Sequence, residues 1–136
     1  MDKWQAQQKF WSSFTFTENG DEKPLPAYDE QTLFEKGSQP AFPHITYQSF
    51  GGNLGQTATL SASIWDRSRS WQRVKTLADK IQRKIVNDTP VTIKLDDGYM
   101  WIKVPATIPF AQPMASEDDT IKRIVLTVEA ECLSQA

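Results

Sequence analysis

Few side chains in this sequence could do chemistry, and none of them is grouped in a recognisable catalytic or metal-binding pattern. The chain has one histidine, His44, and one cysteine, Cys132. A catalytic triad or a Cys–His pair would have to use His44 with a partner that nothing in the sequence marks. His44 also lies on the polar face of a predicted strand, where it needs no special role. We therefore expect no enzyme activity, no metal and no cofactor.

Acidic residues cluster at two places, and both patterns are typical of loops. An Asp-Asp-Gly run at residues 96–98 lies between two alternating segments, which predicts a β-hairpin turn. A metal site or an acid–base pair is the alternative there. The second cluster, Glu117, Asp118 and Asp119, falls in a predicted acidic loop over residues 115–120. This loop is expected to be solvated, and contact with a cation or a basic partner is the alternative.

A glycine-rich connection over residues 50–56 contains Gly51, Gly52 and Asn53. Glycines of this kind can cradle a phosphate when a helix and a lysine follow them. Neither follows here, because the next segment alternates as a strand does. The sequence therefore predicts a hairpin loop between two strands.

The elements that must position these residues centre on a strand, a sharp corner and a helix. Alternating apolar and polar residues over 57–65 predict a strand with one buried face. Helical spacing then predicts a helix over residues 71–86, with Ser70 as its N-cap and an end at residues 87–90. The corner between strand and helix consists of Trp65, Asp66 and Arg67. Either its side chains cover the sheet edge and bond the turn, or they contact another subunit.

Four further segments alternate in the manner of strands: residues 44–50, 91–95, 99–104 and 121–133. The last is the longest, so we predict that it lies centrally in the sheet. The core face of this strand is predicted to carry Ile124, Leu126, Val128, Ala130 and Cys132. Cys132 is accordingly predicted to be a buried, inert thiol. Prolines in and beside residues 107–114 predict a bent, extended segment that is either an edge strand or a bulged strand.

The N-terminal region combines an aromatic helix with a polar segment. Residues 2–14 are predicted to form a helix, and residues 17–25 a mobile loop. Five aromatic side chains gather in this region: Trp4, Phe10, Trp11, Phe14 and Phe16. They either dock the helix on the sheet or anchor a neighbouring subunit. Together the segments predict an α+β fold, with a mostly antiparallel sheet of four to five strands and helices packed on one face.

The composition is that of a soluble globular protein, with 39% hydrophobic and 24% charged residues. Residues 1–136 are expected to form a single domain. A net charge of −2 and a pI near 5.4 argue against a protein held to nucleic acid by charge, although DNA could still pass nearby. No signal peptide or membrane span is apparent, so we expect a cytosolic, reduced protein.

Several segments, taken in order, resemble one family. They read FWSSF at residues 10–14, PAYDEQT at 26–32, FPHITY at 42–47, LSASIWDRS at 60–68, LDDGYMWIK at 95–103, PFAQ at 109–112 and DDTIKR at 118–123. This series is similar to the tail terminator (tail-completion) proteins of siphophages that infect Gram-positive bacteria. The chain departs from that pattern in two places. Residues 17–25 look like an insertion, and His44 stands where an aromatic residue would be expected.

The resemblance implies a structural protein of the virion. Proteins of this family form a hexameric ring that caps the tail tube, ends its polymerisation and docks to the head connector, with DNA passing through the lumen. The implied partners are further copies of the chain, the major tail-tube protein and a head connector or stopper protein, but no membrane. The implied location is the tail or neck of the virion, after assembly in the host cytoplasm.

Three segments are candidate contacts in such a ring. The loops over residues 50–56 and 112–120 are predicted to meet neighbouring subunits or the lumen, and the corner at residues 65–67 is a further candidate. Two other functions stay open. One is a head-completion protein, a stopper or adaptor at the same joint. The other is a small-ligand-binding α+β domain, which would need an apolar pocket with a few convergent polar groups.

Overall fold

The computed structural model describes residues 1–31, 40–51, 57–88 and 91–134. Its helices are α1 (Lys3–Trp11) and α3 (Gln72–Asn87). Its strands are β1 (Thr15–Glu18), β2 (Asp21–Pro24), β3 (Ala27–Asp29), β4 (His44–Tyr47), β5 (Thr57–Arg67), β6 (Val91–Leu95), β7 (Gly98–Lys103), β8 (Ala111–Met114) and β9 (Ile121–Ser134).

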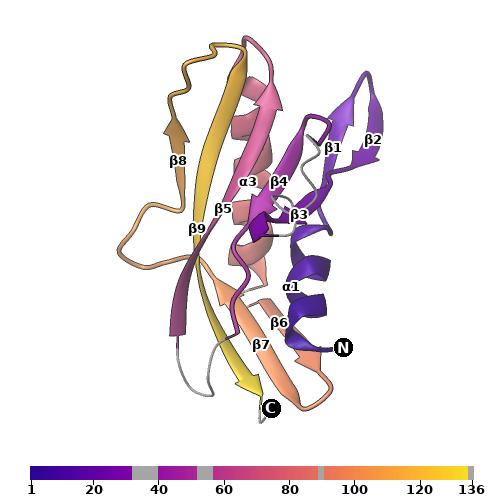
Figure 1. The fold of residues 1–136 in the computed structure, drawn as a ribbon, viewed down its shortest axis with the longest axis vertical. Helices are drawn as coiled ribbons and strands as arrows, with labels where there is room; N and C mark the ends of the chain where they lie inside the picture. The colour runs from indigo at the N-terminus through magenta and orange to yellow at the C-terminus, as the bar shows by residue number, and fades with distance from the viewer. Residues whose placement is uncertain (32–39, 52–56, 89–90, 135–136) are drawn as a thin grey trace.

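Seven of the strands form one sheet in the order β3-β4-β5-β9-β7-β6, with β8 also paired to β9 (Figure 1). All of the pairs are antiparallel except β3 with β4. The predicted α+β class and the mostly antiparallel sheet are therefore confirmed. The predicted count of four to five strands was too low. Strand β3 was missed because it has only three residues and directly follows Pro26, whereas the four-residue β8 falls in the segment predicted to be a bent edge or bulged strand.

Strand β9 is central, as the sequence predicted. It pairs with β5 along its first eleven residues and with β7 and β8 on its other side. The five side chains predicted for its core face are all buried, and Cys132 is 1% exposed. Long, well-alternated strands in the middle of a sheet bury one face completely, so their pattern is easy to recognise.

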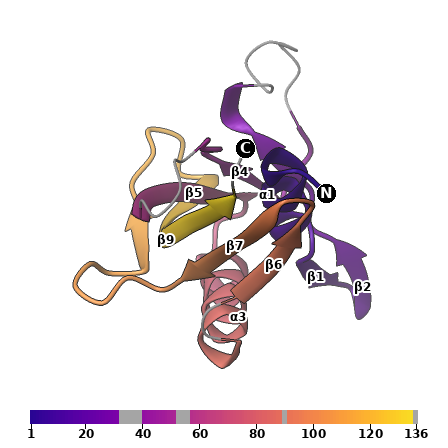
Figure 2. The ribbon, with the colours of Figure 1, turned by 90° about the horizontal axis from the view of Figure 1, so that it is seen from below.

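Both helices cover the same face of the sheet. Trp11 of α1 stacks on Tyr47, and Arg73 of α3 bonds Asp66. Tyr47 of β4 is paired with Ala62 of β5, so these two side chains point to the same face of the sheet. Ala62 and Asp66 also share a face of β5, because side chains alternate along a strand. The contact of α1 with Tyr47 and the contact of α3 with Asp66 therefore lie on the same face. Seen end-on, the sheet curls, and α1 contacts both of its outermost strands, β3 and β6 (Figure 2). The prediction that the helices pack on one face is confirmed.

Helix α3 begins slightly later than predicted. Its N-cap is Trp71, which makes no side-chain cap bond, so the prediction of Ser70 was wrong by one residue. Ser70 Oγ still accepts a hydrogen bond from the amide of Gln72, at 3.1 Å, and so satisfies one of the amides at the start of the helix that have no partner within it. The helix ends at Asn87, as predicted.

Helix α1 is shorter than the predicted range of residues 2–14. Asp2 is its N-cap and forms a capping box with Gln5, in which each side chain accepts from the other residue's amide, at 2.8 and 3.0 Å. The helix ends at Trp11, and the chain turns through Ser12. A strand pair therefore begins only a few residues later.

The aromatic residues of this region belong mainly to the chain's own core. The buried ones are Phe10, Trp11, Phe14 and Phe16. Trp11 stacks on Tyr47 with ring centroids 6.2 Å apart. Of the two alternatives, docking on the sheet is therefore correct for these four. Trp4 is 50% exposed and is the one member of the group that is available to a neighbour.

Residues 17–25 are not a mobile loop, as the sequence had suggested, but most of a β-hairpin. Strands β1 and β2 pair antiparallel, with Glu18 opposite Asp21. Asn19 and Gly20 form the turn with φ angles of +53° and +82°, and Asn-Gly is the sequence that tolerates both. The prediction failed because all four β2 side chains are exposed, so no buried face produces an alternating pattern. The hairpin projects from the body of the protein (Figure 1).

The other predicted turns and edges are present. Leu95 pairs with Gly98 across the Asp-Asp turn between β6 and β7, so the aspartates at 96–97 belong to a hairpin. Strands β4 and β5 are antiparallel neighbours, as a hairpin between them requires, while most of the loop predicted over residues 50–56 lies outside the described residues. Strand β8, which contains Pro113, pairs with β9 alone and is the predicted edge strand.

Candidate functional site

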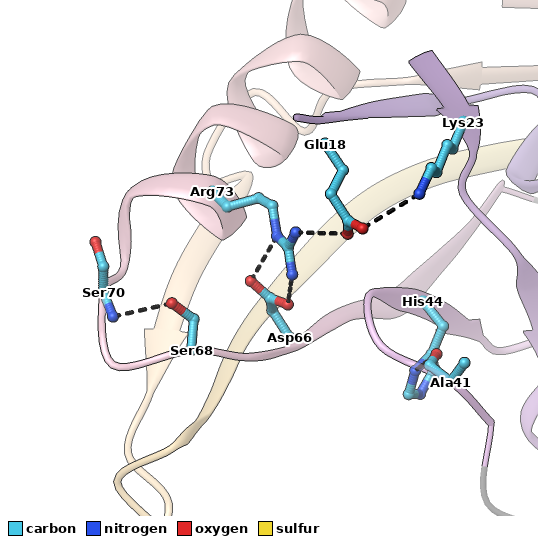
Figure 3. Close-up of polar contacts among 8 residues, drawn as sticks. All are labelled: Glu18, Lys23, Ala41, His44, Asp66, Ser68, Ser70 and Arg73. Carbon is cyan, nitrogen blue, oxygen red and sulfur yellow. Dashed lines mark hydrogen bonds and ion pairs between the residues drawn. The ribbon is translucent and has the colours of Figure 1, made fainter. Parts of the chain in front are cut away.

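The corner between β5 and α3 contains a buried ion pair (Figure 3). The Asp66 side chain is completely buried, and its carboxylate accepts two hydrogen bonds from Arg73. The Nε–Oδ2 distance is 2.9 Å and the Nη2–Oδ1 distance is 2.5 Å. Such bidentate pairs are the strong form of a charge-assisted hydrogen bond, and this one raises the pKa of the Arg73 guanidinium.

Asp66 was identified from the sequence as a candidate contact residue, but its partner Arg73 was not. A signal for the pair was present, because Asp66 shares the buried face of β5 with Ala62 and Ile64. A carboxylate on a core-facing position requires a cation or several hydrogen-bond donors. Only the three-dimensional arrangement of strand and helix shows that Arg73 is that cation.

Arg73 also ties the projecting hairpin to the body. Its Nη1 lies 3.3 Å from Glu18 Oε2, and Glu18 Oε1 lies 3.2 Å from Lys23 Nζ (Figure 3). Farther along α3, Lys80 Nζ donates to the carbonyl oxygen of Thr15 at 3.1 Å. The hairpin is thus held against α3 by ion pairs and hydrogen bonds from two successive parts of the helix.

Trp65 lies on the opposite face of the sheet from this ion pair. Its Nε1 donates to Thr46 Oγ1 at 2.9 Å, and its ring stacks on His44 with centroids 6.4 Å apart. The Arg123 guanidinium lies 4.6 Å from the centroid of the Trp65 ring, which is a cation–π contact. Trp65 therefore covers its own sheet, as one of the two alternatives for the corner predicted.

His44 is buried in an aromatic group rather than placed on an open polar face. It is 4% exposed and contacts the rings of Phe42 and Tyr28, at centroid distances of 5.0 and 6.0 Å. Its Nδ1 lies 3.0 Å from the carbonyl oxygen of Ala41 (Figure 3). Burial lowers the pKa of His44, and the hydrogen bond to Ala41 offsets this only in part. The imidazole thus occupies the place of the aromatic residue that the family resemblance led us to expect.

The lowered pKa of His44 predicts a pH-dependent stability. Between the folded pKa and the ordinary value of 6.5, the unfolded chain binds the proton more readily than the folded chain. The free energy of unfolding should therefore be at its full value above pH 6.5 and should fall as the pH decreases through that interval. Urea unfolding from about pH 5 to pH 8 measures this effect. In His44→Phe the decrease should become smaller, and an unchanged pH profile would contradict the assignment.

The structure brings the acidic loop next to the corner. Asp118 Oδ1 accepts from the hydroxyl and the amide of Thr120, at 2.6 and 2.9 Å. These bonds lower the pKa of Asp118, and the nearby cations Arg67 and Lys122 lower it further. The amide of Ser68 donates to the carbonyl oxygen of Thr120 at 2.7 Å, which fixes the base of the loop. Two of the candidate contacts thus meet at one end of the molecule.

The glycine-rich connection lies elsewhere. Gly51 is near the start of α1, where a Cβ at this residue would come within 3.1 Å of the Trp4 indole. Gly52 and Asn53 lie outside the described residues. Thr57, the first residue of β5, lies at the opposite end of that strand from Arg67 and the acidic loop. The structure therefore does not bring Gly51 together with the corner.

A cleft of about 510 Å³ opens between the β1–β2 hairpin and the start of α3, and we call it the hairpin–helix cleft. Three cationic side chains line it: Arg67, Arg73 and Lys80. Hydroxyl groups, including those of Ser68 and Ser70, line it as well. The sequence could not reveal this cleft, because the hairpin that forms one wall was predicted to be a loop.

Within the described ranges, no three His, Cys, Asp or Glu side chains gather in a group that could hold a metal ion. The described helices include none that is long and apolar enough to cross a membrane. The charged residues at the corner link β5, α3 and the hairpin through ion pairs and hydrogen bonds. Arg67 differs from them, because it is exposed and lies over the ring of Phe42, 5.2 Å from its centroid.

Comparison of the chain with known protein families gives no match. Comparison with curated proteins gives no similar sequence either. The functional argument therefore rests on the motif series in the sequence and on the geometry of the corner.

Proposed function

We propose that this chain is a structural protein of a phage head–tail joint. In this role it is a tail terminator, whose hexameric ring caps the tail tube, ends its polymerisation and docks to the head connector while DNA passes through the lumen. The motif series supports the proposal, because it runs in order through most of the chain. No catalytic step, metal or cofactor is part of it.

The observation that carries the proposal is the firm attachment of a projecting hairpin to a sheet body. An isolated two-stranded hairpin has marginal stability, yet here it is joined to α3 through Arg73 and Lys80. Phe16 of β1 is itself buried, with the guanidinium of Arg73 over its ring. Pre-organised surfaces move little on binding, so a packed body with a projecting element held in a fixed direction suits a protein that joins subunits.

A head-completion protein at the same joint is the nearest alternative, and co-assembly separates the two. We expect the purified chain to co-sediment with tubes of the cognate major tail-tube protein and not with the isolated portal or capsid protein. Tubes sedimented alone, and the chain sedimented alone, are the controls. Binding to the portal or capsid protein without binding to tubes would contradict the terminator and favour the stopper.

The ligand-binding alternative gains no support from the hairpin–helix cleft. Small-molecule pockets are mainly apolar with a few polar groups. This cleft is lined by cations and hydroxyls, with Phe16 and Leu77 as its apolar members. We therefore propose no second function.

A further inference from the structure

The sheet has a second face, opposite to the one that α1 and α3 cover, and we call it the outer face. Side chains of paired residues point to the same side of a sheet, so the register arranges those of the outer face in rows across the strands. One row contains Met114, Arg123 and Trp65. A second row, farther along β9, contains Trp101 and Glu131. Because the sheet curls around α1, the outer face is convex, and its central strands β5 and β9 are the most accessible to a partner (Figure 2).

The row that contains Arg123 has a positive charge without a counter-charge. Arg123 Nε donates to Ser63 Oγ at 3.0 Å, and the guanidinium lies over the Trp65 ring. It forms no ion pair within the described ranges. Met114, which is paired with Arg123, is 39% exposed. This end of the outer face therefore presents a cation together with apolar surface.

The row that contains Glu131 has the opposite character. The Glu131 carboxylate has no hydrogen-bond or ion-pair partner in the part of the chain that the structure describes. The neighbouring carboxylate of Glu129 is already paired with Lys103 Nζ, at 3.6 Å. Trp101 lies beside Glu131, and Tyr99 of the same strand is 50% exposed. This end therefore presents a free carboxylate together with aromatic surface.

Small side chains separate the two ends. Ser61 is paired with Thr127, and Ser63 with Val125, all on the outer face. Sheets that pack face to face lie about 10 Å apart. A middle region without long side chains allows a second sheet to approach to that distance.

The two ends are complementary to each other under a two-fold rotation. An axis that runs across the strands at Thr127 brings two outer faces together with their strands antiparallel. Arg123 of one copy then faces Glu131 of the other, because Thr127 lies midway between them in β9. Met114 faces Trp101 in the same way, because β8 and β7 both pair with the edge of β9 that β5 does not use. Such a contact uses the same surface of both copies and is isologous.

We propose that two copies of this chain pair through their outer faces in solution. Arg123 of each copy binds Glu131 of the other, and Met114 packs on Trp101. The charged pairs fix the register, and the contact between a thioether and an aromatic ring is favourable. The inference goes beyond the proposed function, since subunits of a six-fold ring meet through heterologous contacts. The two-fold contact is additional to the ring, so the two proposals can fail separately.

Charge reversal at the two residues tests the contact. The variants are Arg123→Glu, Glu131→Arg and a third chain that carries both substitutions. Sedimentation velocity over a concentration series, at low and at high salt, measures dimer formation. We expect the wild type to dimerise, more weakly as salt increases, and each single variant to dimerise at least about ten-fold more weakly. The double variant should dimerise as the wild type does, because exchanging the two charges forms both ion pairs again.

Mixing the two single variants gives a second measurement. In the mixed dimer the two introduced charges face each other with opposite sign, and so do the two native ones. The mixture should therefore form a dimer that neither variant forms alone. This recovery also shows that both single variants are folded.

A matched control changes the charge away from the outer face. Lys75→Glu on α3 changes the net charge by as much as Arg123→Glu, and Lys75 is exposed. This control should dimerise as the wild type does. The proposal is overturned if the wild type stays monomeric at every concentration, if the single variants dimerise normally, or if neither the double variant nor the mixture recovers the dimer.

Two further outcomes separate this contact from the capping of tail tubes. If the wild type forms only hexameric rings and Arg123→Glu no longer co-sediments with tail tubes, the outer face binds the tube protein and the two-fold contact is wrong. If the charge exchange restores the dimer but no tube is capped, the contact stands and the proposed function fails.

Discussion

Replacing Arg73 with alanine is expected to destabilise the protein by about 3–5 kcal/mol, because it leaves the carboxylate of Asp66 buried without a counter-charge. Asp66 is completely buried, and both of its side-chain hydrogen bonds come from Arg73. The substitution also releases Glu18 on the hairpin. Urea unfolding followed by fluorescence measures the change in the free energy of unfolding.

A matched control is available on the same helix. Arg83 pairs with Asp79 at 2.8 Å, but its side chain is 76% exposed, so Arg83→Ala should cost only a few tenths of a kcal/mol. The double variant Asp66→Leu with Arg73→Leu should be far less destabilised than Arg73→Ala, since no buried charge is then left alone. Equal effects of Arg73→Ala and Arg83→Ala would show that the buried pair has been misassigned.

Replacing Trp11 with alanine should cost about 3–5 kcal/mol, the range for a large aromatic side chain removed from a core. Trp11 is 3% exposed, stacks on Tyr47 and meets the edge of Phe10, with ring centroids 4.8 Å apart. The loss removes the ring stacking that docks α1 on β4 and leaves the hydrogen bond from the Tyr47 hydroxyl to Gln8. The same denaturant measurement gives the size of the effect.

Trp4 provides the comparison within the same helix. It is 50% exposed, so Trp4→Ala should change the free energy of unfolding by no more than about 0.5 kcal/mol. If Trp4 contacts another subunit, its replacement weakens self-association while leaving the fold intact. A large loss of stability in Trp4→Ala, or a small loss in Trp11→Ala, would contradict the assignment of Trp4 to the surface and of Trp11 to the core.

The parts of the fold that were predicted correctly are those whose pattern reflects a single buried face. Strand β9 and helix α3 have the alternating and helical spacings that burial on one side imposes. The Asp-Asp-Gly turn between β6 and β7 is also local, because two residues determine its backbone. Such elements need no information from the rest of the chain.

The parts that were missed depend on contacts between distant segments. The β1–β2 hairpin has few buried side chains, and its Asn-Gly turn was hidden in a polar segment. His44 shares a face with polar residues in the sequence, yet Phe42, Tyr28 and Trp65 close over it in the structure. No periodicity within one strand can show such burial.

The candidate site was predicted in part. The sequence named the corner and the acidic loop separately, and the pairing of Arg67 with Ile121 explains why they meet. That register places the start of β9, and the loop before it, beside the end of β5. Strand β5 begins at Thr57, at the far end of the strand from Arg67, and Gly51 lies near Trp4 of α1, so Gly51 does not belong to the same site. The length and register of β5 therefore decide which candidate contacts lie together.

The most direct test of the central proposal is the length of tail tubes assembled in the presence of this protein. The cognate tail-tube protein is polymerised with and without the chain, and tube lengths are measured in negative-stain micrographs. We predict shorter tubes as the chain is added, each with a six-fold ring at one end. Tubes of unchanged length without rings would contradict the assignment as a tail terminator.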